Sequence, residues 1–104
     1  MFHLTKKDFQ EKVLSGEGTA VVMFYEKWCP NCSMTRPLVE EAEEKYRGRV
    51  SFYEVEITEE PALAAAYKVD LVPAFLFVKR GRLTGYMKGI PGEKTLEKRI
   101  GELL

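Results

Sequence analysis

The two cysteines of the chain, Cys29 and Cys32, are separated by two residues in the segment Trp28-Cys29-Pro30-Asn31-Cys32. An apolar run, residues 20–25, precedes them and a segment of helical character follows. Cys29 is therefore expected to cap a helix, with Pro30 at the first helical position, where a missing N–H has no consequence. The free N–H groups and the dipole of that helix favour a thiolate over a thiol. We expect Cys29 to act as a nucleophile, and Cys32 to attack any mixed disulfide that Cys29 forms.

Other interpretations of two cysteines at this spacing are weaker. They could form half of a four-ligand zinc site, but the only other soft donor in the chain is His3. A structural disulfide that closes so short a loop would restrain little of the unfolded chain. Two buried and inert cysteines are a third interpretation, against which their place at a strand-to-helix turn argues. We expect no metal and no cofactor.

The composition of the chain limits its class and its partners. Its 104 residues predict one domain, residues 1–104, and an apolar content of 45% is ordinary for a soluble protein. Sixteen basic residues balance sixteen acidic ones, so no net field would attract nucleic acid or anionic lipid. No apolar run approaches the ~20 residues that a membrane span needs, and the N-terminus lacks the features of a secretory signal. We therefore expect a cytoplasmic monomer that binds neither nucleic acid nor membrane.

Alternating strand and helix patterns predict an α/β fold around the cysteines. Residues 20–25 are typical of a strand that is buried on both faces, and residues 50–57 of a second strand after a helix over 30–47. This order predicts a right-handed parallel crossover. Strands over 74–78 and 83–87, joined by a turn at Arg80-Gly81, are expected to form a hairpin. Helices are also predicted over 61–67, at the C-terminus and from Thr5. At Thr5 the side chain can cap the N–H groups near Asp8 and Asp8 can reach back, which is a capping box.

The apolar spacing of three helices predicts their inward faces. Phe9 and Val13 share a face of the first helix. The helix over 30–47 is expected to bury Leu38, Ala42 and Tyr46, and the last helix Leu96, Ile100 and Leu103.

The order of these elements, together with several motifs, resembles thioredoxin. The motifs are Trp28-Cys29-x-x-Cys32, a proline that interrupts the next helix, Val72-Pro73 before a Phe-Leu-Phe strand, a hairpin glycine, and a glycine before the last helix. The resemblance covers essentially the whole chain, which makes it far more specific than a C-x-x-C pair alone. It implies a mixed central sheet, with a parallel βαβ half and a C-terminal antiparallel hairpin, flanked by about four helices. It also implies that Pro73 is cis and lies beside the cysteines.

The resemblance further implies a thiol–disulfide oxidoreductase that reduces protein disulfides. By match to family positions, Cys29 is the attacking thiol and Cys32 the resolving one, and the two form the redox disulfide. An extended substrate would lie on a surface made by Trp28, Pro30, Asn31, Val72, Pro73, Gly89 and Ile90. The partners would be disulfide-containing proteins and a separate reductase as electron donor. The alternative is an interaction module that keeps the fold and does not need its cysteines.

The chain departs from the thioredoxin pattern at three places. Pro30-Asn31 replaces the usual Gly-Pro between the cysteines, Met23 replaces a buried Asp, and Glu54 replaces the Lys that partners it. Glu54 is therefore a candidate proton acceptor for Cys32, since a desolvated carboxyl would titrate high and could take that proton. The alternative is a Glu54 that reaches solvent.

Overall fold

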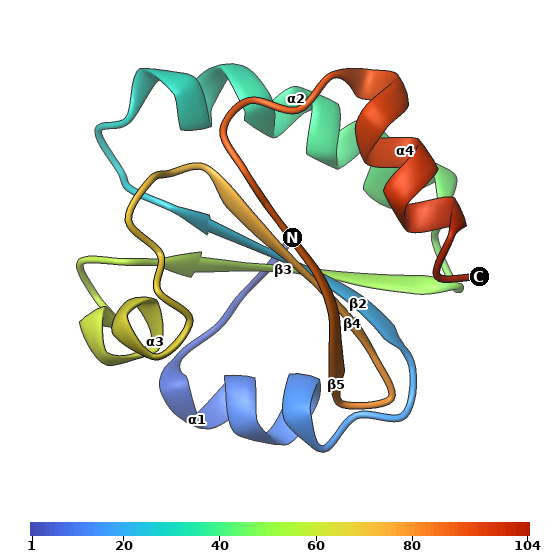
Figure 1. Ribbon diagram of the computed structural model, residues 1–104, viewed down its shortest axis with the longest axis horizontal. Helices are drawn as coiled ribbons and strands as arrows, with labels where there is room; N and C mark the ends of the chain where they lie inside the picture. Colours follow the sequence, from blue (N-terminus) through green and yellow to red (C-terminus); the bar gives the residue numbers. More distant parts are fainter.

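The computed structural model describes residues 1–104 as a five-stranded mixed sheet with helices on both faces (Figure 1). The strands lie in the order β1-β3-β2-β4-β5. In chain order the elements are β1 (Phe2–His3), α1 (Lys6–Asp8), η1 (Phe9–Leu14), β2 (Thr19–Tyr25), α2 (Pro30–Lys45), β3 (Val50–Glu56), α3 (Pro61–Ala66), β4 (Ala74–Lys79), β5 (Arg82–Lys88) and α4 (Glu93–Gly101). None of the helices has the length and apolar character that a membrane-spanning helix requires.

The sheet has the predicted parallel half and antiparallel hairpin. Strand β2 pairs with β3 in parallel and with β4 in antiparallel orientation, so it lies at the centre of the sheet. The β4–β5 hairpin turns at Arg80 and Gly81, whose φ angles of 52° and 77° suit the twist of a two-residue hairpin loop. The register of this hairpin shifts between Phe77 and Val78, where the ladder carries a bulge or irregularity.

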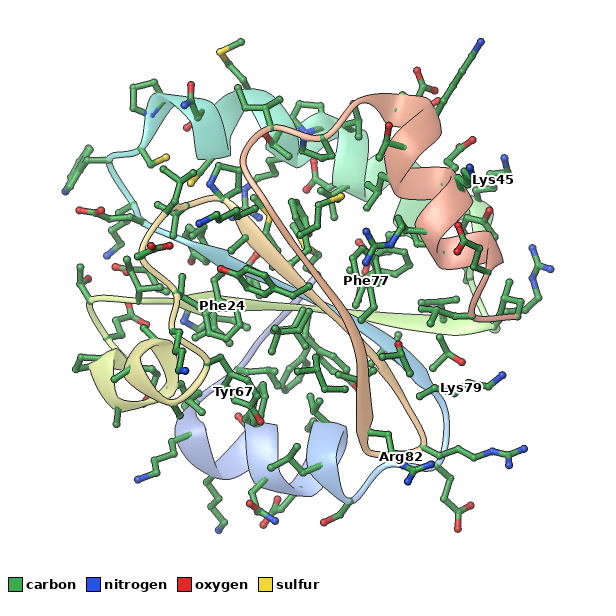
Figure 2. All side chains as sticks on the ribbon, in the orientation of Figure 1. Phe24, Lys45, Tyr67, Phe77, Lys79 and Arg82 are labelled. Atoms are coloured by element: carbon green, nitrogen blue, oxygen red, sulfur yellow. The ribbon has the colours of Figure 1, made fainter.

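Each face of the sheet has its own apolar core. Alternate residues of β2 point to opposite faces, as the period of a strand requires: Met23 joins the core under α2 and α4, and Phe24 joins the core under α1, η1 and α3. In Figure 2, Phe77 lies on the side of α2 and α4, whereas Phe24 lies near Tyr67 on the other side. Because both faces of β2 are covered, the strand is apolar along its length.

The buried stripe of helix α2 includes the predicted Ala42 and Tyr46, together with three residues that the apolar spacing did not predict. Cys32, Thr35, Val39, Ala42 and Tyr46 are buried, at intervals of three and four residues. Leu38 packs against this core as predicted but is only half-buried, because the stripe begins at Cys32 and its centre passes through Val39.

The N-terminal region has two features that the sequence pattern did not predict. Residues 2 and 3 form the edge strand β1, paired in parallel with β3. The predicted capping box of Thr5 and Asp8 is present, but the helix then continues as the π-helix η1, in which the Ser15 N–H reaches the Gln10 carbonyl at 3.1 Å. Phe9 and Val13 are buried on the same face of this segment, as predicted.

Candidate active site

The two cysteines lie at the N-terminus of α2, immediately after the loop that follows β2. Cys29 is the N-cap residue, with φ −92° and ψ 111°, and Pro30 occupies the first turn. The Cys29 Sγ accepts a hydrogen bond from the Cys32 backbone N–H at 3.1 Å. Both thiols are free; Cys29 is half-buried, whereas Cys32 is 3% exposed. The turn therefore presents one sulfur to solvent and keeps the other behind it.

A second loop, directly before the start of β4, approaches the accessible sulfur. The Cys29 thiol lies 3.8 Å from the Val72 carbonyl oxygen, to which it donates. The Val72–Pro73 peptide bond is cis. A third segment joins at Gly89, whose N–H donates to the Pro73 carbonyl at 2.8 Å. Three segments that are far apart in sequence therefore meet at the cysteines.

Exposed apolar side chains flank each of these three segments. Trp28, directly before Cys29, is 87% exposed. Leu71, before Val72, and Ile90, after Gly89, are also exposed, as is Met34 on the first turns of α2. These four exposed side chains all lie on the segments that meet at the cysteines. The polar residue between the cysteines, Asn31, is exposed as well.

The buried thiol is held in its protonated form. Burial is the largest influence and raises the pKa of Cys32 to about 12, and the hydrogen bond and charge of Cys29 act in the same direction. A backbone hydrogen bond from Glu26 lowers the pKa of Cys32, while the Glu26 carboxylate charge raises it. Glu26 is therefore near enough to Cys32 for its charge to affect the thiol.

Glu54 does not have the environment expected of it. Burial tends to raise its pKa, but the Glu54 carboxylate accepts hydrogen bonds from Arg36 at 2.7 Å, from His3 at 2.9 Å and from the Tyr25 hydroxyl at 2.9 Å. These bonds outweigh burial, and the pKa of Glu54 is lowered. The prediction of a desolvated carboxyl that titrates high is wrong, and Glu54 lacks the raised proton affinity that the acceptor role required. It is also not free in solvent, since its side chain is only 12% exposed.

Three partners of Glu54 were missed by the sequence reasoning. His3 bridges Glu54 and Glu59, the second contact at 2.8 Å, and hydrogen bonds to the two carboxylates raise the pKa of His3. The Arg36 guanidinium also lies 4.9 Å from the ring centroid of Tyr25. Only the position of Arg36, one helical turn after Cys32, could have indicated this cluster.

The position of the missing family carboxylate is filled by an apolar side chain. Met23 lies opposite Glu54 in the β2–β3 register and is fully buried. No set of three or more His, Cys, Asp or Glu side chains has an arrangement that could hold a metal ion.

Comparisons with known proteins agree with this geometry. A family model described as Thioredoxin matches residues 1–102. A thioredoxin of Chlorobaculum thiosulfatiphilum is 29% identical over 97% of this chain and 94% of its own length. The mouse mitochondrial thioredoxin is 34% identical over 93% of this chain and 58% of its own length, and the chloroplastic thioredoxin M4 of Arabidopsis thaliana is 30% identical over 98% and 53%. With its mixed sheet and its paired thiols at a helix start, the chain belongs to the thioredoxin family of thiol–disulfide oxidoreductases.

Proposed function

We propose that the chain reduces disulfides in other proteins by a dithiol cycle of Cys29 and Cys32. The observation that supports this most directly is the arrangement of the two sulfurs. Cys29 is reachable and receives the Cys32 N–H at 3.1 Å, which would stabilise charge on its sulfur, and Cys32 lies one turn behind. This geometry favours attack by the first thiol and resolution by the second.

The cycle conserves atoms and electrons in two steps. The Cys29 thiolate attacks one sulfur of the substrate disulfide, the substrate S–S bond breaks, and one substrate cysteine leaves and takes up a proton. Cys32 then loses its proton and attacks the Cys29 sulfur, so the mixed disulfide breaks and the second substrate cysteine leaves. The substrate gains two electrons, and a Cys29–Cys32 disulfide remains. A separate reductase must return those electrons.

The substrate would bind as an extended segment beside Val72. A strand added to a free backbone edge gains affinity from main-chain hydrogen bonds and so depends little on sequence. The exposed apolar side chains of Trp28 and Ile90 would contact its side chains, with Pro30, Asn31, Pro73 and Gly89 completing the surface. The breadth of this contact fits a reductase of many protein disulfides.

We also propose that the protein works as a monomer in a compartment that keeps thiols reduced, for which the cytoplasm is our prediction. Its relatives include proteins named as mitochondrial and chloroplastic. The location of a tagged chain in the cell therefore tests the predicted compartment.

Reduction of insulin by dithiothreitol tests the proposed activity. Cys29→Ser should abolish the acceleration that the wild-type chain gives. Cys32→Ser should still attack and should accumulate a mixed disulfide, visible by mass spectrometry under non-reducing conditions. Ser33→Ala changes an exposed neighbour and should keep the wild-type rate. Full activity of Cys29→Ser would overturn the proposal and favour the interaction module.

A further inference from the structure

The second step of the cycle requires a base, because the resolving thiol is buried and protonated. Burial raises the pKa of Cys32 to about 12, far above neutral pH, so this thiol is protonated at pH 7. Part of this effect comes from Cys29 and disappears once Cys29 is in a mixed disulfide, but burial, the largest cause, remains. Strand β2, before the cysteines, has no carboxylate on the face of the sheet that packs against Cys32, because Met23 is buried there.

Most carboxylates near the cysteine-bearing segments are engaged by other groups. Glu54 is held by Arg36, His3 and Tyr25. Glu56 is 2% exposed and binds the Thr58 N–H at 2.6 Å and the Thr58 hydroxyl. Asp70, two residues before Val72, lies 3.6 Å from the Lys88 ammonium. Each of these three carboxylates therefore already has a polar or charged partner.

Glu26 is the exception. It directly follows β2, and its carbonyl accepts the Cys29 N–H at 3.2 Å, which closes a turn from Glu26 to Cys29. Its side chain is half-buried and its carboxylate forms no ion pair. A backbone hydrogen bond from Glu26 lowers the pKa of Cys32, so the backbone of Glu26 lies next to the resolving residue.

We infer that Glu26 accepts the proton that Cys32 loses when it resolves the mixed disulfide, a role that rests on the proposed function. The proton passes from the Cys32 sulfur to the Glu26 carboxylate, directly or through one water. The resulting thiolate attacks the Cys29 sulfur, and the bond between Cys29 and the substrate breaks. The substrate cysteine leaves as a thiolate and takes up the proton from Glu26 or from solvent. A positioned base of this kind typically accelerates a step by about 10²–10⁴-fold.

Rapid mixing of the reduced chain with one equivalent of dithiobis(nitrobenzoate) separates the two steps. The first release of thionitrobenzoate reports attack by Cys29, and the second reports closure by Cys32. Because thionitrobenzoate leaves without needing a proton, the second phase depends on proton loss from Cys32. Glu26→Gln should keep the first phase within about twofold and slow the second at least tenfold near pH 7. In Glu26→Gln the rate of the second phase should then rise about tenfold per pH unit, because hydroxide becomes the base.

Three further variants make the result specific. Glu26→Asp should recover part of the second-phase rate, while Glu41→Gln, an exposed carboxylate on α2, should leave both phases unchanged. Urea unfolding of each variant shows whether it is folded. A wild-type second phase in Glu26→Gln, with an unchanged pH profile, would overturn the inference, as would slowing in Glu54→Gln alone. Absence of the first phase in the wild-type chain would instead overturn the proposed function.

Discussion

Glu54→Gln should destabilise the protein, although Glu54 has no place in the proposed chemistry. The carboxylate accepts three hydrogen bonds at a site where its side chain is 12% exposed. Glutamine keeps the size of the side chain and one acceptor oxygen, but it has no charge. Its NH₂ group replaces the second oxygen and cannot accept a hydrogen bond from the groups that donate to Glu54. A hydrogen bond to a charged group contributes about 1.5–3 kcal/mol. Arg36 and His3 are 31% and 42% exposed, so solvent screening reduces these contributions, and we expect a net loss of about 2 kcal/mol.

Urea unfolding at pH 6 measures this loss. For a chain of this size, ~2 kcal/mol lowers the midpoint of unfolding by about 1 M urea. Glu41→Gln removes an exposed carboxylate from α2 and should change the free energy of unfolding by less than about 0.5 kcal/mol. A loss in Glu54→Gln no larger than that of Glu41→Gln would refute the reasoning.

The same variant should change how stability depends on pH. The pKa of His3 is raised above its ordinary value of 6.5, mainly by Glu54, so the folded chain binds more protons than the unfolded chain as pH rises past 6.5. The contribution of His3 is therefore complete below pH 6.5 and is lost as pH passes the raised pKa. Glu54→Gln should flatten this loss and move the His3 pKa back toward 6.5. The chain has one histidine, so NMR titration of its imidazole signal gives that pKa directly.

Two further substitutions test the hairpin turn and the proposed substrate surface. Gly81→Ala should lower the free energy of unfolding by about 2 kcal/mol, because φ is +77° and an added Cβ would lie 2.3 Å from the Leu14 carbonyl oxygen. Gly18→Ala, with no heavy atom within 4 Å of its added Cβ, is the matched control in urea unfolding, and equal losses would contradict this account. Trp28→Ala should change stability by less than about 0.5 kcal/mol, since the side chain is 87% exposed, but should raise KM for insulin several-fold. An unchanged KM would remove Trp28 from the substrate surface.

The sequence predicted the features that depend on local pattern. The spacing of the cysteines, Pro30 at the helix start and the apolar strand before them predicted the turn that the structure shows. The capping box of Thr5 and Asp8 and the hairpin at Gly81 were found in the same way. In each case the neighbouring residues determine the backbone conformation almost by themselves.

The features that the sequence did not predict depend on contacts between distant segments. His3 reaches Glu54 only because β1 pairs with β3, and a strand of two residues has no periodicity to detect. Glu54 was therefore judged without the partners that lower its pKa. Leu38 was expected at the centre of the buried stripe and Val39 was missed, because apolar spacing alone cannot show that a buried cysteine and Thr35 set the register of the helix. Glu26 belongs to no sequence motif; the role that we infer for it depends on the turn that joins it to Cys29 and on its place beside Cys32.

The two edge strands of the sheet disfavour self-association of this protein through its sheet. One edge strand is β1, which is only two residues long. The other is β5, which begins with Arg82, ends with Lys88 and pairs with β4 in a register that shifts at Phe77. Short, charged or irregular border strands are poor templates for a second molecule. This chain, for which we propose an extended substrate beside Val72, is thus poorly suited to pair with its own copies along the sheet.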